Sequence, residues 1–144
     1  MAKNKANIKG AVESRSFQKS LNQAEKYAKD LEKTTRLLER AVKKSEGLDD
    51  KSLVELWDYF KALLRLIEAS VRRRYVAVPW QSLVMALAAV IYFVNPLDFI
   101  PDFIPLFGYL DDVTILAYVI RRIKHDIDAF LTWETKQLTA ATGS

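Results

Sequence analysis

The sequence has no cysteine and a single histidine among its 144 residues, so several common kinds of functional site are excluded. Without cysteine, the chain cannot form disulfides, a catalytic thiolate or a cysteine-ligated zinc site. The one histidine, His125, cannot build a histidine dyad, triad or zinc cluster within one chain. No serine lies in the G-x-S-x-G context of a nucleophile elbow. We therefore expect no enzymatic activity and no cofactor.

The sequence also lacks a secretion signal and strand-like patterns. Residues 1–9 are basic, but no apolar segment follows them as a signal peptide would require. We therefore expect a location in the cytoplasm or on the cytoplasmic side of a membrane. No segment shows the period-two alternation of a half-buried strand, and so the expected fold class is all-α.

Positive charge is concentrated in the first half of the chain. Residues 1–74 contain 18 Lys and Arg against 11 Asp and Glu, whereas residues 75–144 contain 4 against 7. This asymmetry favours contact of the first half with an anionic surface such as lipid headgroups, although charges of this kind also simply solvate exposed helices. Nucleic acid is not the expected partner, because the cations alternate with glutamates and form no recognition motif.

A heptad pattern in residues 15–46 predicts one long helix with an apolar seam. Its seam residues recur at spacings of four and three: Phe17, Leu21, Ala24, Ala28, Leu31, Thr35, Leu38 and Val42. The next apolar series predicts a second helix: Leu53, Trp57, Phe60, Leu64, Ile67 and Val71. We expect these two helices to form an antiparallel hairpin over residues 15–74, preceded by a disordered basic tail at 1–14.

A third helix is expected from Pro79 to about Val94, and it has no polar face. Between Leu83 and Val94 the only polar side-chain group is the hydroxyl of Tyr92. Such a helix must be surrounded by protein or by lipid. These residues are fewer than the roughly 20 that are needed to span a bilayer.

A fourth helix is expected to begin at Asp111 or Asp112, either of which can cap it, and to end near Trp133. Its apolar stripe consists of Val113, Leu116, Ile120, Ile123, Ile127 and Phe130. The expected architecture is thus a four-helix protein. Its second part, residues 75–134, pairs an apolar helix with a final helix across a proline-rich turn, and residues 135–144 are expected to be disordered.

The connection between the last two helices, NPLDFIPDFIPLFGYLDD at residues 95–112, is the most unusual segment. It combines prolines and aspartates with an otherwise apolar composition. The residues to which we assign structural roles are Asn95, Pro96, Asp98, Pro101, Asp102, Pro105, Gly108, Asp111 and Asp112. Asn95, Pro96 and Asp98 resemble a capping box, and Gly108 suits a close approach or a special backbone conformation.

Two hypotheses remain open for the aspartates of this segment. They are either helix caps and ion-pair partners of nearby arginines, or oxygen ligands of a divalent cation such as Mg²⁺, Mn²⁺ or Ca²⁺. The candidate ligands are Asp98, Asp102, Asp111 and Asp112. Their spacing matches no established metal-binding loop, and so we expect the structural role.

The same segment, followed by an apolar and basic helix, resembles the signature of the YkvA-like family of bacterial domains of unknown function. The family pattern reads roughly SPIDLIPDFIPVLGYLDD, and the resemblance covers about residues 76–125. Asn95 replaces a small polar residue of that pattern. The resemblance implies association with a membrane but no defined activity, and the helices at 15–71 lie outside it.

A cluster of cations and aromatic side chains precedes the apolar third helix. It consists of Arg72, Arg73, Arg74, Tyr75 and Trp80, a combination that is typical of a membrane interface. The alternative is that Tyr75 and Trp80 pack against the fourth helix. We expect the apolar segment 76–110 to enter the membrane surface while the cations bind anionic lipid. The expected role is that of a scaffold or adaptor, whose helical seam is open to a protein partner or a second copy. The alternative is a soluble helical bundle that encloses the third helix and acts as a protein-interaction module.

Overall fold

The structure, a computed structural model, describes the backbone of residues 15–46, 54–94 and 108–143 and the side chains of residues 21–46, 54–94 and 115–141. This part of the chain is all-α, as expected, and contains no strand. Its six helices are α2 (Arg15–Ala28), α3 (Leu31–Glu46), α4 (Val54–Val71), α5 (Trp80–Val94), α7 (Gly108–Arg122) and α8 (Lys124–Gly143).

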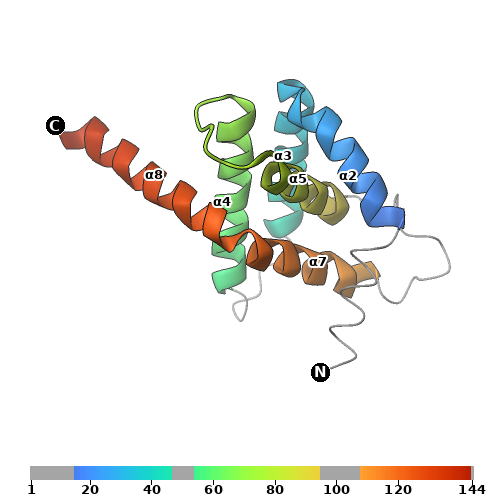
Figure 1. Ribbon diagram of the computed structural model, residues 1–144. Helices are drawn as coiled ribbons and strands as arrows, with labels where there is room; N and C mark the ends of the chain where they lie inside the picture. Colours follow the sequence, from blue (N-terminus) through green and yellow to red (C-terminus); the bar gives the residue numbers. More distant parts are fainter. Residues whose placement is uncertain (1–14, 47–53, 95–107, 144) are drawn as a thin grey trace.

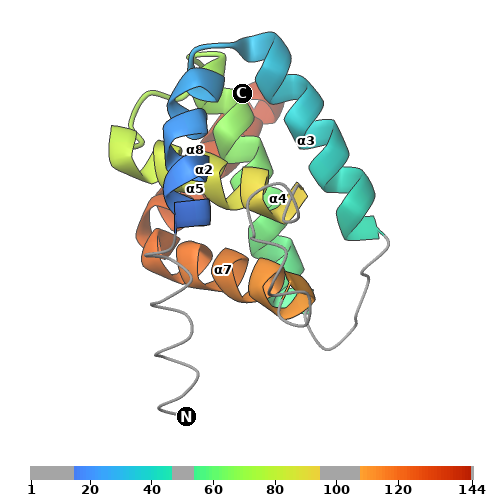
Figure 2. The same cartoon turned by 90° about the vertical axis from the view of Figure 1, so that its right-hand side faces the viewer.

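Helix α5 is the centre of the molecule. It packs against α2, α3, α4 and α7, which lie around it on different sides (Figure 1, Figure 2). Every side chain from Leu83 to Phe93 is buried except that of Met85, which is partly buried. Protein therefore encloses α5 from Leu83 to Phe93, whereas its first residue, Trp80, is exposed. Enclosure of this segment is what the alternative hypothesis expects.

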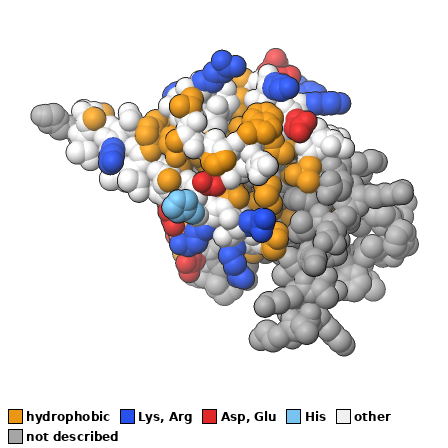
Figure 3. Space-filling view, in the orientation of Figure 1, with side chains coloured by type: hydrophobic (Ala, Val, Ile, Leu, Met, Phe, Trp, Pro, Cys, Tyr) orange, Lys and Arg blue, Asp and Glu red, His pale blue; other side chains and the backbone are white. Residues whose placement is uncertain are grey.

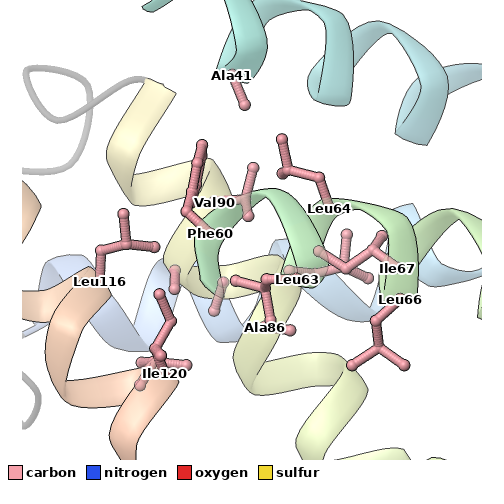
Figure 4. Packing of buried hydrophobic residues seen from close by; sticks show 14 of the residues in the cluster. Ala41, Phe60, Leu63, Leu64, Leu66, Ile67, Ala86, Val90, Leu116 and Ile120 are labelled. Carbon is pink, nitrogen blue, oxygen red and sulfur yellow. The ribbon is translucent and has the colours of Figure 1, made fainter. Parts of the chain in front are cut away.

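The core around α5 is built from the apolar stripes that the sequence predicted in α4 and in the last helices. Phe60, Leu63 and Ile67 of α4 are buried together with Leu116 and Ile120 of α7 (Figure 4). An aromatic contact also joins α4 to α5, with the ring centroids of Phe60 and Phe93 5.0 Å apart. At the far end of α5, the Lys44 ammonium of α3 donates a hydrogen bond to the Phe93 carbonyl.

The single helix predicted for residues 15–46 is wrong, because the chain turns at Lys29 and Asp30 and separates α2 from α3. The carboxylate Oδ1 of Asp30 accepts a hydrogen bond from the Lys33 amide at 3.1 Å and thereby caps α3. The buried Thr34 hydroxyl donates to the Tyr27 carbonyl at 2.6 Å and ties the two helices together.

This turn changes the face that α3 buries. Thr34, Leu37, Leu38 and Ala41 are buried, whereas the expected seam residues Leu31 and Val42 are exposed. The predicted four-helix arrangement is therefore not the observed one. Helix α2 lies along α5, and α3 packs on α4 and α5.

The last predicted helix is observed as two consecutive helices, α7 and α8. The ladder of backbone hydrogen bonds continues across Ile123, whose amide donates to the Val119 carbonyl at 2.9 Å. Because α7 begins at Gly108, neither Asp111 nor Asp112 is its N-cap. Helix α8 extends to Gly143, where disorder was expected, and its end lies away from the other helices (Figure 1).

Candidate functional site

An open groove lies where the α2–α3 turn meets the connection between α4 and α5. We call it the corner groove, and its volume is about 630 Å³. The α2–α3 turn contributes Ala28, Lys29 and Leu31 to its lining. The end of α4 and the connection to α5 contribute Ser70, Val71, Arg73, Tyr75, Val76 and Val78, and α5 contributes Trp80 and Leu83.

The end of α4 shapes one wall of this groove through a Schellman motif. The Arg74 amide donates to the Ala69 carbonyl at 2.9 Å, and the Arg73 amide donates to the Ser70 carbonyl at 3.1 Å. Arg73 consequently has a φ of 63°, in the left-handed region that glycine usually occupies at this position. The backbone turn thus places an arginine side chain on the groove.

The three consecutive arginines have different surroundings. Arg72 and Arg74 both approach Glu68, with distances from Oε1 of 3.9 Å to Arg72 Nε and 3.4 Å to Arg74 Nη2. Arg73 lines the groove and forms no ion pair with the residues that the structure describes. Of the described residues that line the groove none is acidic, and so Lys29 and Arg73 make this lining positive.

The aromatic residues predicted to contact a membrane are only partly accessible. Trp80 is 49% exposed beside Val76, which is 81% exposed. Tyr75, by contrast, is buried, with its ring 5.2 Å from that of Phe130 and 5.1 Å from that of Trp133. Tyr75 is therefore a core residue at this position, and the expectation that it faces a membrane is wrong.

Ser70 is an unusual member of the groove lining. Its Oγ is buried and has no hydrogen-bond partner among the described residues. A serine inside a helix commonly donates to the carbonyl four residues earlier, and this one does not. The hydroxyl thus lies beneath the groove surface with its hydrogen-bonding capacity unused by the described residues.

Cations and apolar side chains are neighbours on this face of the molecule. The α4–α5 connection lies at the front of the view in Figure 1. In the same orientation, Figure 3 shows blue side chains along the upper edge, next to a broad group of hydrophobic ones. This pairing is typical of surfaces that contact lipid headgroups.

A polar cluster that the sequence analysis missed joins α8 to α4 and α5. The Ser82 hydroxyl donates to Asp126 Oδ2 at 2.5 Å, and the Tyr59 hydroxyl donates to Asp128 Oδ1 at 3.0 Å. Lys124 donates to Asp128 Oδ2 at 3.0 Å. The spacing of Lys124 and Asp128 on one helix was a signal for their pairing, whereas the contacts with α4 and α5 depend on the tertiary fold.

These contacts shift the pKa values of their members. The hydrogen bond from Lys124 lowers the pKa of Asp128 below its ordinary value of 3.8, and the same bond raises the pKa of Lys124. Burial raises the pKa of Tyr75 above 10.0, and the negative charge of Asp126 raises it further. The shifts are those of stabilising structural contacts, since each favours the charge state present near neutral pH.

The structure leaves the proposed metal ligands untested. The structure describes only the backbone of Gly108, Asp111 and Asp112. The other motif residues lie outside the described part of the chain: Asn95, Pro96, Asp98, Pro101, Asp102 and Pro105. Within the described part of the chain, no three acidic or histidine side chains gather as a metal site would require. The metal-binding and ion-pairing hypotheses for the aspartates therefore stand as predictions, whereas capping of α7 by Asp111 or Asp112 does not.

Comparison with known proteins finds a family model and a relative that are similar to part of the chain. Residues 82–118 match the family model described as a protein of unknown function, DUF1232. The Bacillus subtilis (strain 168) protein named "Uncharacterized membrane protein YkvA" is 36% identical over 53 residues, which are 37% of this chain and 50% of the relative. Residues 82–118 are YkvA-like. This confirms the resemblance that the 95–112 segment predicted, and no solved structure matches the chain significantly.

The YkvA-like segment includes α5 and the first part of α7, and the matched region spans half the length of the relative. Most of the corner groove lies outside this segment, because only Leu83 of its lining falls within residues 82–118. The relative is named a membrane protein. Of the helices described in this chain, none combines the length and the apolar character that crossing a membrane requires.

Proposed function

We propose that the protein is a non-enzymatic helical adaptor that attaches peripherally to an anionic membrane through the α4–α5 connection. The observation that carries this proposal is the exposure of Val76 and Trp80 beside Arg72–Arg74 and the corner groove. Apolar side chains of this kind enter the headgroup boundary, while neighbouring cations are attracted to anionic lipid. The Bacillus subtilis relative is named a membrane protein, which supports attachment to a membrane.

The mode of attachment differs from the expectation that the whole segment 76–110 enters the membrane. The side chains from Leu83 to Phe93 are already committed to the protein core, and exposing them would cost the packing of four neighbouring helices. Insertion is therefore proposed only for the α4–α5 connection and for Trp80, the first residue of α5.

Flotation on vesicles tests the proposal. Vesicles of phosphatidylcholine alone are compared with vesicles that also contain phosphatidylglycerol, at low and at high salt. The protein is expected to float with the anionic vesicles at low salt and to dissociate as salt screens the charges. A double variant, Val76→Ser with Trp80→Ser, is expected to stay in the bottom fraction.

The matched control for this experiment is Leu138→Ser, which removes an apolar side chain that is 67% exposed on α8, away from the groove. It is expected to float as the wild type does. Failure of the wild type to float on anionic vesicles, or equal flotation of the double variant, would contradict the proposal.

The second candidate function is a protein-interaction module, and the enclosure of α5 by the chain's own helices favours it. The far end of α8, with its exposed Leu138, provides a surface for a partner helix or a second copy. Light scattering in detergent-free buffer separates the two functions. A concentration-dependent dimer that Leu138→Asp abolishes, together with no flotation, would favour the interaction module.

A further inference from the structure

We propose that the corner groove binds one anionic phospholipid, with the phosphate held by Arg73 and Lys29 and an acyl chain held by the apolar lining. This inference rests on the proposed membrane attachment and names the lipid component that is recognised. It assigns to the groove a defined ligand, whereas the proposed function requires only a surface.

The charges of the groove fit a phosphate. Lys29 and Arg73 both line it, and its described lining contains no acidic side chain. Glu68, near the end of α4, forms ion pairs with Arg72 and Arg74. These two cations offset its negative charge and so reduce its repulsion of an anion in the groove. An arginine fork also donates two parallel hydrogen bonds to a phosphate, which gives geometric selectivity for that group.

The remaining lining fits a hydrocarbon chain. Leu31, Val71, Val78 and Leu83 contribute aliphatic side chains, and Trp80 contributes an aromatic one. A groove of about 630 Å³ falls within the range of about 300–1,000 Å³ that small-molecule sites usually occupy. A small hydrophilic anion would leave this apolar surface exposed to water, whereas an amphipathic lipid would cover it.

Ser70 supplies an independent indication of a ligand. Ser70 lines the groove, and its Oγ is buried just beneath the groove surface without a hydrogen-bond partner among the described residues, so that a rotation of the side chain would bring it to a ligand. A buried polar group in this state is costly unless something pairs with it. Ester and phosphate oxygens of a phospholipid are acceptors, and one of them would satisfy this hydroxyl.

The backbone conformation of Arg73 also supports a binding site in the groove. Its left-handed conformation is unfavourable for any residue with a Cβ, and glycine would avoid that penalty. An arginine here gives up backbone stability and places a cation on the groove. Retained strain of this kind is characteristic of binding sites.

Calorimetry with a soluble lipid tests the inference. Dihexanoyl phosphatidic acid, below the concentration at which it forms micelles, is titrated into the wild-type protein, with inorganic phosphate and glycerol 3-phosphate as headgroup probes. Saturable binding of the lipid is expected, at least tenfold tighter than that of either probe. Equal affinity for inorganic phosphate would overturn the lipid assignment in favour of a simple anion site.

Arg73→Gly is the decisive variant, because glycine relieves the backbone strain and so removes the cation without weakening the fold. It is expected to lower the affinity for the lipid at least tenfold, and Ser70→Ala is expected to lower it by a smaller factor. The control is Arg122→Gln, which removes a cation from an exposed position on α7 outside the groove. Unchanged binding by Arg73→Gly would overturn the proposal.

Failure of this inference and failure of the proposed function give different results. Flotation on anionic vesicles without saturable binding of the soluble lipid would overturn the groove as a lipid site and leave peripheral attachment standing. The absence of both would overturn both. Saturable binding without flotation would support the groove and contradict the attachment of the whole protein to membranes.

Discussion

At Arg73, the backbone conformation favours glycine, whereas the groove favours a cationic side chain. The Schellman motif at the end of α4 requires a left-handed backbone at this position, and the groove beside it requires a cation. Glycine would adopt the left-handed backbone without strain, whereas arginine supplies the cation. The conflict can be measured, because the two demands affect different quantities: the free energy of unfolding and the affinity for an anion.

The first prediction is that Arg73→Gly stabilises the protein. Relief of the left-handed strain is expected to raise the free energy of unfolding by about 1 kcal/mol. Urea denaturation followed by circular dichroism measures this change. The control is Lys61→Gly, at an exposed position in the middle of α4, which is expected to lower the same free energy by about 1 kcal/mol. A decrease for Arg73→Gly would contradict the assigned backbone conformation.

Asp128 leads to a second prediction at the residue scale, and this one depends on pH. Its pKa is lowered in the folded protein, and so its ionised form stabilises the fold above the ordinary pKa of 3.8. That contribution is lost as the pH falls through the lower folded-state pKa. Asp128→Asn is therefore expected to have a lower unfolding temperature than the wild type at pH 7, with the difference shrinking as the pH falls below 3.8.

Thermal unfolding of both proteins across this pH range measures the effect. Asp58→Asn removes a carboxylate from an exposed position on α4 and serves as the control. It is expected to change the unfolding temperature little at pH 7. A deficit of Asp128→Asn that persists at low pH would show that the hydrogen-bond geometry, rather than the charge on Asp128, stabilises the contact with Tyr59 and Lys124.

At the scale of the helices, the sequence predicts most where apolar periodicity determines burial. The stripe of α4 and that of α7 and α8 were expected from their spacing, and Phe60, Ile67, Leu116 and Ile127 are indeed buried. The bounds of α5 were predicted by Pro79 and by the end of the apolar run. In each case the spacing of apolar residues along the sequence agrees with the side chains that the fold buries.

The α2–α3 turn could not be predicted in this way, because the apolar spacing continues across it. Phe17 to Val42 form an unbroken heptad series, yet the chain turns after Ala28. Local hydrogen bonds favour a turn here over a continuous helix. Asp30 caps α3, and Thr34 bonds to the Tyr27 carbonyl. The turn lets α2 lie on α5 while α3 packs against α4, so that burial of α5 also favours it.

The third prediction concerns this turn. Asp30→Ala removes the cap of α3 and is expected to lower the free energy of unfolding by about 1 kcal/mol. Asp30→Ser restores a capping oxygen and is the matched control, with a change of only a few tenths of a kcal/mol. Urea denaturation measures both changes. An unaffected Asp30→Ala variant would indicate that α2 and α3 form one continuous helix in solution.

At the scale of the whole molecule, the groove depends on packing that no local pattern shows. The sequence identified Arg72–Arg74 and Trp80 as surface candidates, and these residues lie at or beside the groove. It placed Tyr75 among them because it could not show that α8 brings Phe130 and Trp133 against this ring. Lys29 and Leu31 were missed because they reach the groove only through the α2–α3 turn, and Ser70 was missed because no local pattern marks its position at the end of α4.

The fourth prediction separates attachment to a membrane surface from insertion into it. Hydrogen exchange followed by mass spectrometry is measured with and without anionic vesicles. The amides of residues 83–93 are expected to exchange slowly in both conditions, because α5 lies in the core. The amides of residues 75–78 lie in the connection and are expected to exchange more slowly only when vesicles are bound.

The contrast between these two segments follows from the free energy of the fold. Moving α5 into lipid would remove the apolar partners of α2, α3, α4 and α7 together, which costs far more than a peripheral contact returns. Vesicles should therefore change exchange at the connection and leave α5 as it is. Vesicles of phosphatidylcholine alone provide the control, with no change in either segment. A vesicle-dependent rise in exchange across α2 and α7 would mean that the bundle opens and releases α5 to the membrane, and surface attachment would then be wrong.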